Sequence, residues 1–228
     1  MFSIVIPAFN EENILQESID SIFAWSKTNL IKLELIIINN NSTDKTESIC
    51  KNNLTKYKSF KYENESKQGK GFAVKEGLRK SSYKKILILD ADLSVNIDQF
   101  NLNWLDYEEI CIAGSRFQGK VIGTPARRTL TGKIFSFLVK SLFKISVDDT
   151  QCGFKYISCN NISTLVNKLT VGNFAYDVDF LLSVKSCDIK TLVIPVTYVH
   201  NAESSVSILK HSLGMLITLI KLRNKSFD

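Results

Sequence analysis

The stretch from Leu33 to Asn41 reads LELIIINNN, a nearly continuous apolar run that passes directly into three asparagines. A strand with one wet face alternates apolar and polar residues, whereas a strand covered on both faces reads as an unbroken apolar run. The stretch therefore predicts an interior strand of a parallel sheet, with polar side chains placed at its carboxyl end.

Strand and helix patterns alternate on both sides of this run. Further strands are expected at Ser3–Ala8, Tyr57–Tyr62 and Lys84–Leu89, and helices over residues 11–25, after the cap 42–44 and over 71–79. Alternation at this spacing predicts an α/β fold, a mainly parallel twisted sheet with helices on both faces.

The second half of the chain is less regular. Strands are expected at 110–115 and 191–198, helices at 127–145, 176–186 and 205–223, and a compact polar link at 150–156. Because no linker or repeat interrupts these patterns, we expect residues 1–228 to form a single domain. Its last helix, within about 205–225, is amphipathic.

The composition limits which partners the protein can bind and where in the cell it is expected. The net charge of +6 favours anionic partners, but the basic residues are spread through helices rather than set on an aromatic platform, which argues against nucleic acid. The odd number of cysteines, five, indicates reduced thiols. No segment reaches the roughly 18 apolar residues that a membrane span needs, so we expect a cytoplasmic protein, peripheral on a membrane.

Asp90-Ala91-Asp92 follows the predicted strand at 84–89 and is the strongest chemical signal. Residues two apart in an extended segment project to the same side, so both carboxylates can hold a hard divalent cation such as Mg²⁺ or Mn²⁺. The alternative is a solvated turn after a strand. Polar clusters also follow the strands that end at Ala8 and Ile38, and ligands of parallel sheets bind beyond these ends.

Five motifs carry a resemblance to a known family. They are residues 4–12 (IVIPAFNEE), 68–73 (QGKGFA), 89–93 (LDADL), 114–116 (GSR) and 149–155 (DTQCGFK). In this order, over about residues 2–200, the chain resembles family 2 glycosyltransferases of the GT-A fold, closest to the branch that makes dolichyl-phosphate or polyprenyl-phosphate sugars, in its glucosyltransferase version.

The resemblance implies roles for individual residues. The nucleotide would be held by the first-strand loop, the Gly-flanked lysine and the segment after the fourth strand: Pro7, Ala8, Asn10, Glu11, Lys70, Asp90 and Ala91. Asp90 would face the ribose and the metal, and Asp92 would be the direct metal ligand. Arg116 and one of Arg127 or Arg128 match positions implied to bind phosphates.

One departure concerns the second strand. The family usually has Asp-Asp-Gly-Ser there, whereas this chain has Asn39 and Asn40, which keep a place among the candidate nucleotide contacts. An amide donates as well as accepts hydrogen bonds, so the selectivity for the base is open.

The acceptor decides whether a general base is needed. A phosphate acceptor is already an anion and needs positioning, whereas a hydroxyl acceptor calls for a base, for which Asp149, Asp177 and Asp179 are candidates. Asp177 and Asp179 would not share a helix face, so at most one can point into the site.

Two basic, apolar helices, at 127–145 and near the end of the chain, are compatible with a membrane surface or with ordinary core packing. We therefore expect an inverting, metal-dependent transferase that moves glucose or mannose from a UDP- or GDP-sugar to polyprenyl or dolichyl phosphate at an anionic membrane, where a membrane protein can assist attachment. The alternatives are a family 2 transferase with a soluble or glycan hydroxyl acceptor, and a catalytically silent adaptor.

Overall fold

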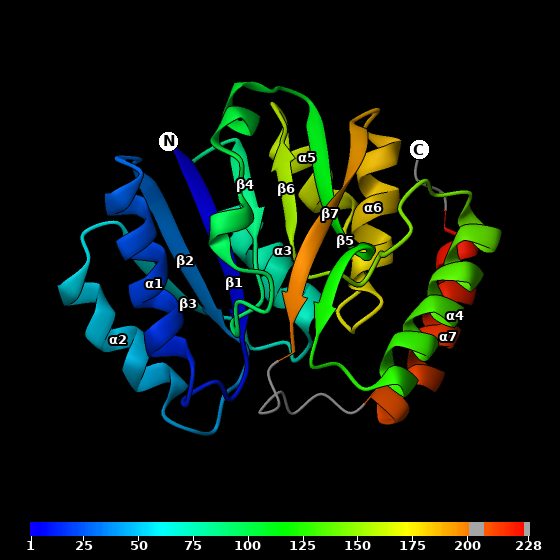
Figure 1. Cartoon of the computed structure of the whole chain (residues 1–228), viewed down its shortest axis with the longest axis horizontal. Coiled ribbons are helices and arrows are strands. Elements are labelled where there is room, and N and C mark those ends of the chain that lie inside the picture. The colour runs from blue at the N-terminus through cyan, green and yellow to red at the C-terminus, as the bar shows by residue number, and fades with distance from the viewer. Residues whose placement is uncertain (201–207, 226–228) are drawn as a thin grey trace.

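The computed structural model describes the backbone of residues 1–200 and 208–225, and the side chains within these ranges except 126–130, 208–213 and 216. Seven strands form one sheet in the order β3-β2-β1-β4-β6-β5-β7 (Figure 1). The strands are β1 (Phe2–Ala8), β2 (Leu33–Asn39), β3 (Phe60–Asn64), β4 (Lys85–Ile88), β5 (Ile110–Ile122), β6 (Lys155–Ser158) and β7 (Lys190–Val199). The helices are α1 (Leu15–Thr28), α2 (Thr46–Lys56), α3 (Lys70–Lys80), α4 (Ala126–Phe143), α5 (Ile162–Lys168), α6 (Tyr176–Ser186) and α7 (Ile208–Arg223), with two short 3₁₀ helices at Ile97–Gln99 and Leu102–Asp106.

The sheet is mainly parallel, as predicted. β1 pairs in parallel with β2 and β4, β2 with β3, and β5 with β7, whereas β6 runs antiparallel to both β4 and β5. β6 and α5 were not predicted, because four strand residues and seven helix residues give too little periodicity to detect. The segment 150–156, expected as a link, contains the start of β6.

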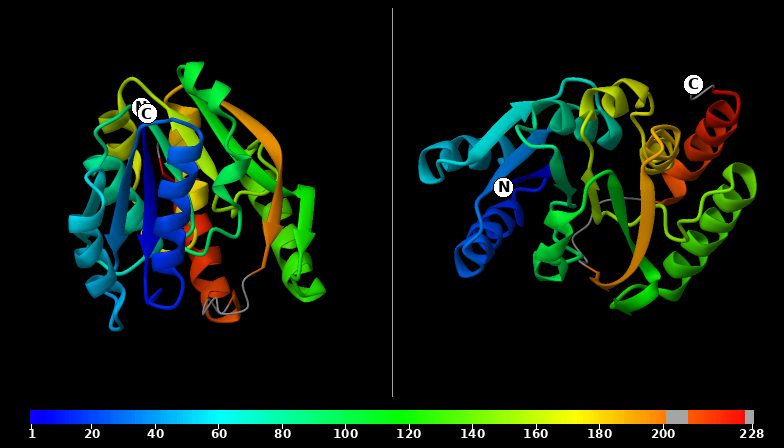
Figure 2. Two further views of the ribbon diagram at one scale, coloured as in Figure 1. Left: turned by 60° about the vertical axis from the view of Figure 1, so that its left-hand side comes forward. Right: turned by 90° about the horizontal axis from the view of Figure 1, so that it is seen from above.

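Helices cover both faces of the sheet, which explains the unbroken apolar run of β2 (Figure 2). Alternate β2 residues enter two cores: Ile36 and Ile38 pack in the core that includes residues of α3 and α6, and Leu35 and Ile37 in the core that includes residues of α1. All four are fully buried. The prediction of an α/β fold with helices on both faces is confirmed.

The far edge of the molecule carries α4 and α7, which contact each other and lie side by side in Figures 1 and 2.

All five cysteines are free, in agreement with the reduced thiols expected from the sequence. Within the described ranges no helix is both long and apolar enough to cross a membrane.

Candidate functional site

The loops after β1 and β2 are hydrogen-bonded to each other at the carboxyl edge of the sheet. Asn10, with a left-handed φ of 56°, accepts a hydrogen bond on Oδ1 from the Thr43 amide at 2.8 Å. The amide of Glu11 donates to Thr46 Oγ1 at 2.8 Å, and the carbonyl of Glu11 accepts the amide of Leu15 at the start of α1. These bonds place the side chain of Glu11 beside the end of the sheet.

The two asparagines after β2 hold neighbouring chain rather than open space. Asn40 Nδ2 donates to the carbonyls of Glu65 and Lys67, and Asn40 Oδ1 accepts the amide of Gly69 at 2.6 Å. Asn39 Nδ2 donates to Asn64 Oδ1 at 2.8 Å. Because a carboxylate cannot donate to two carbonyls, the Asn40 amide suits this place and fixes the segment that leads into α3.

The centre of the site is an ion pair between α3 and the end of β4. Lys70, the first residue of α3, places Nζ 2.5 Å from Asp90 Oδ1 and 5.5 Å from the ring centre of Tyr176. Burial alone would raise the pKa of Asp90, but the Lys70 ammonium holds that pKa below its usual range. Asp90 is therefore an ionised carboxylate in a half-buried place.

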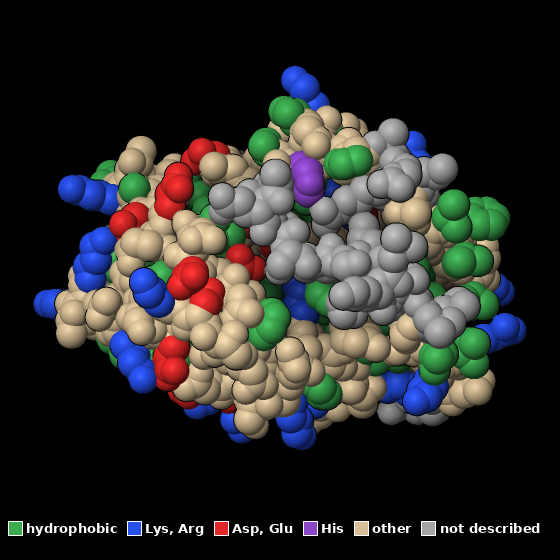
Figure 3. All heavy atoms as spheres, turned by 90° about the horizontal axis from the view of Figure 1, so that it is seen from below, with side chains coloured by type: hydrophobic (Ala, Val, Ile, Leu, Met, Phe, Trp, Pro, Cys, Tyr) green, Lys and Arg blue, Asp and Glu red, His purple; other side chains and the backbone are tan. Residues whose placement is uncertain are grey.

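Asp92 and Glu11 add negative charge beside this pair, and acidic side chains gather on one side of the same edge in Figure 3. Asp92 accepts the amide and the hydroxyl of Ser94 at 2.9 and 2.6 Å. Burial, and after it the charge of Asp90, raises the pKa of Asp92. Burial and then the charges of Asp92 and Asp90 raise the pKa of Glu11 to about 7. The sequence motifs flagged these three acids, and the structure brings them into mutual electrostatic contact.

Asp90 is also confined from the side of β6. A Cβ atom on Gly153 would lie 2.0 Å from Asp90 Oδ2, so only glycine leaves room for this carboxylate. The backbone of Ala91 is tied to α1, since its carbonyl accepts Ser18 Oγ at 2.6 Å. Pro7 is half-buried and Ala8 is buried at the end of β1.

Arg116 and Asp149 form a two-pronged ion pair. Arg116 Nε and Nη2 donate to the two oxygens of Asp149 at 2.7 and 2.8 Å, and the Arg116 amide donates to Asp149 Oδ2 at 2.9 Å. Asp149 is 1% exposed. The guanidinium also lies over the ring of Tyr198. Asp149 therefore orients Arg116. The two other candidate arginines, Arg127 and Arg128, lie in α4, and their side chains are outside the described part of the structure.

Asp177 and Asp179, at the start of α6, are both buried and both paired with a lysine. Asp177 Oδ1 accepts Lys155 Nζ at 2.5 Å. Asp179 Oδ1 accepts Lys225 Nζ at 2.7 Å. Sequence reasoning did not single out Lys155, although this residue ends the motif 149–155. Only the structure shows that its side chain is 1% exposed and that its charge pairs with Asp177 inside the protein.

No group of three or more His, Cys, Asp or Glu side chains in the described residues is arranged as a ready metal site. The carboxylates of Asp90, Asp92 and Glu11 nevertheless fit a divalent cation in chemistry. Mg²⁺ and Mn²⁺ prefer oxygen ligands. The raised pKa values of Asp92 and Glu11 arise from burial and then from the neighbouring negative charges, and a bound cation would offset both.

Replacing Gly153 by alanine is expected to lower the free energy of unfolding by about 1–3 kcal/mol, because the new methyl group meets the Asp90 carboxylate. Denaturant unfolding measures this. Gly132→Ala in α4 is the matched control, since its Cβ would meet only the ring of Phe117 at 3.7 Å. Equal stability of the two variants would contradict the close contact.

The raised pKa of Glu11 predicts a pH-dependent stability. The folded-state pKa of about 7 lies above the ordinary 4.5, so the contribution of Glu11 is fully present below pH 4.5 and is lost as the pH rises to about 7. Glu11→Gln should therefore gain stability relative to the unaltered chain over this window. The rise corresponds to about 3 kcal/mol, which solvent screening around a half-buried side chain reduces to about 1–2 kcal/mol. Parallel pH curves of unfolding free energy would contradict it.

Several known glucosyltransferases are similar to this chain along most of its length. The dolichyl-phosphate beta-glucosyltransferase ALG5A of Trichomonas vaginalis is 28% identical over 96% of this chain and 72% of its own length. The dolichyl-phosphate beta-glucosyltransferase of Dictyostelium discoideum is 26% identical over 97% of this chain and 73% of its own. That of Homo sapiens is 29% identical over 78% of this chain and 61% of its own.

Among solved structures, glucosyl-3-phosphoglycerate synthase from Mycobacterium tuberculosis superimposes with a TM-score of 0.71 at 18% identity, covering 99% of this chain and 80% of that one. That enzyme was crystallised with Mn²⁺, UDP-glucose and phosphoglyceric acid. The likeness confirms the GT-A fold. The family model described as glycosyl transferase family 2 matches residues 3–162. This match spans more than half of the sequence, so the chain is a glycosyltransferase and belongs to glycosyl transferase family 2.

Proposed function

We propose that this glycosyltransferase moves glucose from UDP-glucose to a polyprenyl or dolichyl phosphate, with inversion at the anomeric carbon. The relatives that match along nearly the whole chain carry the name dolichyl-phosphate beta-glucosyltransferase, which supports both the sugar and the acceptor. The similar glucosyl-3-phosphoglycerate synthase was crystallised with UDP-glucose and Mn²⁺, which supports UDP-glucose as the donor and the use of a divalent ion.

The observation that carries this proposal is the half-buried Lys70–Asp90 pair with Asp92 and Glu11 beside it. Breaking a sugar–diphosphate bond develops negative charge on the leaving group, which fixed cationic groups stabilise. The Lys70 ammonium stands at the N-terminus of α3, where the helix dipole also favours a phosphate. Asp90 and Asp92 would hold Mg²⁺ or Mn²⁺, whose charge would further neutralise the diphosphate.

The ion pairs of the three other aspartates favour a phosphate acceptor. Asp149, Asp177 and Asp179 are each paired with a cation, so each is engaged in positioning rather than free to take a proton. A hydroxyl acceptor needs such a base, whereas a phosphate monoester is already an anion. Arg116, oriented by Asp149, is the described arginine suited to bind a phosphate.

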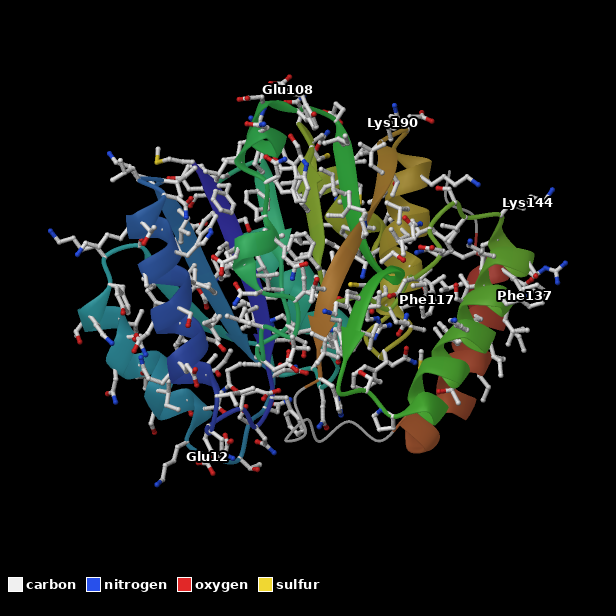
Figure 4. All side chains as sticks on the ribbon, viewed as in Figure 1. Glu12, Glu108, Phe117, Phe137, Lys144 and Lys190 are labelled. Carbon is white, nitrogen blue, oxygen red and sulfur yellow. The ribbon has the colours of Figure 1, made fainter. Side chains whose placement is uncertain are left out.

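A lipid acceptor requires the protein to reach a membrane, and we propose the cytoplasmic face of an anionic membrane as its place. The outer faces of α4 and α7 support this, because they expose Ile134, Phe137, Leu138, Ile217 and Ile220. Phe137, 70% exposed, lies on the outer side of α4 in Figure 4, and Lys133 and Lys140 lie one turn from it. Apolar side chains flanked by lysines suit the headgroup region of anionic lipid. The single domain over 1–228 and a membrane partner protein stay predictions.

The reaction is tested by transfer of radiolabelled glucose from UDP-glucose to a short polyprenyl phosphate with Mn²⁺ or Mg²⁺. Transfer is expected from UDP-glucose and not from GDP-mannose, and Asp92→Asn is expected to lower the rate about 100-fold or more. Transfer to a soluble hydroxyl acceptor alone would overturn the lipid assignment. A chain that binds UDP-glucose and transfers nothing would be an adaptor.

The membrane surface is tested by co-sedimentation with vesicles that contain anionic phospholipid. Phe137→Ser should weaken vesicle binding about 30-fold, because a buried phenyl ring contributes about 2 kcal/mol to partition into lipid. Leu54→Ser on α2 is the matched control, since Leu54 is 47% exposed on a different part of the molecule. Equal loss in both variants would contradict a specific docking face.

A further inference from the structure

Lys225, just after α7, reaches back into the core of the protein. Its Nζ lies 2.6 Å from the carbonyl of Lys168, 3.0 Å from Thr170 Oγ1 and 2.7 Å from Asp179 Oδ1. Its side chain is 21% exposed and that of Asp179 is 1% exposed. A single ammonium thus joins the end of α7, the start of α6 and the segment between α5 and α6.

Asp179 holds the same segment with its second oxygen. Oδ2 accepts the amide of Thr170 at 2.6 Å and the amide of Val171 at 2.9 Å. Lys225 and Asp179 together therefore fix two backbone amides, one carbonyl and one hydroxyl within residues 168–171. Hydrogen bonds to charged groups are stronger than neutral ones, and this set lies in a mostly water-poor place.

The segment fixed in this way lies directly on the start of α3. The Gly71 amide donates to the Gly172 carbonyl at 2.8 Å. A Cβ atom on Gly71 would lie 2.1 Å from the Val171 carbonyl oxygen, and one on Gly69 would lie 2.3 Å from that of Gly172. Only glycines allow the two backbones to come this close. Lys70 stands between these glycines, so the place of its ammonium depends on residues 171–172.

A second contact ties α7 to the same region. Asn173 Nδ2 donates to Thr218 Oγ1 at 2.8 Å, and Asn173 Oδ1 accepts the amide of Ala175 just before α6. Thr218 lies in α7 and Lys225 is the second residue after it, seven residues further along the chain. Their side chains bond the segment at both ends, Thr218 at Asn173 and Lys225 at residues 168–170.

We propose that Lys225 is a positioning residue of the donor site: through Asp179 and residues 170–172 it fixes the start of α3 and so the Lys70–Asp90 pair. The identity of the donor, a nucleoside diphosphate sugar, rests on the proposed function. The connection between α7 and α3 rests on the contacts alone. α7 thereby links the outer edge of the molecule, proposed above as the membrane face, to the proposed diphosphate site.

The test compares Lys225→Met with Lys221→Met in the full-length chain. Lys221 lies one turn earlier on α7, and its side chain makes no ion pair or hydrogen bond in the described structure that would tie it to residues 168–171. Lys225→Arg, which keeps a cation at the same place, is the rescue variant.

The first readout is hydrogen exchange of backbone amides, which needs no ligand. Lys225→Met should accelerate exchange in residues 168–173 and also in residues 69–73, whereas Lys221→Met should leave both unchanged. Acceleration confined to 168–173 would overturn the proposal, because Lys225 would then stabilise its own surroundings only.

The second readout is the affinity for UDP, measured by titration calorimetry on folded protein. Lys225→Met should weaken UDP binding about 10-fold, which is about 1.4 kcal/mol, and Lys225→Arg should recover most of it. Unchanged UDP affinity together with a lower melting temperature would mean a purely structural ion pair. Failure of the unaltered chain to bind UDP would instead count against the proposed function, and the exchange experiment would still decide the role of Lys225.

Discussion

The ion pair between Lys70 and Asp90 is the interaction around which the functional half of the molecule is arranged. Even a partly shielded charge pair is unfavourable unless its geometry is held, because the desolvation of both ions must be offset. The chain holds it from several sides: Gly153 leaves space for the carboxylate, Gly69 and Gly71 admit residues 171–172, and β4 places Asp90 at the sheet edge. Elements from positions 69 to 172 thus converge on one contact.

Charge is also distributed unevenly around that pair, and this suits a reaction on anions. Asp90 is balanced by Lys70, whereas Asp92 and Glu11 have raised pKa values and no lysine or arginine bonded to them among the described contacts. Farther along the chain the buried aspartates 149, 177 and 179 are each matched by a cation. Unbalanced negative charge is therefore concentrated where a divalent ion would bind, and positive charge is held where phosphates are expected.

Much of the first half could be predicted from the sequence, because a doubly covered strand such as β2 has a distinct pattern and parallel strands end at one edge. The second half was harder. β6 has four residues and runs antiparallel, and β5 continues to Ile122, well past the expected end at Ser115. The ion pair of Arg116 with Asp149 joins residues 33 apart, and a sequence pattern gives no sign of such a partner. Asp149 therefore looked equally suited to act as a base.

The strand order has a consequence for how the chain assembles as it is made. β1 to β4 are neighbours in space and lie within the first 88 residues, so this parallel half, with the contacts of Asn40 in place, needs no later strand to pair. β5 pairs in parallel with β7 about 80 residues later, and α7 follows β7. On the ribosome the loops after β1, β2 and β4 are therefore expected to form early, and residues 168–172, which contact the start of α3, are expected to be fixed last. A partly synthesised chain would then carry the acidic cluster before the position of Lys70 is fixed.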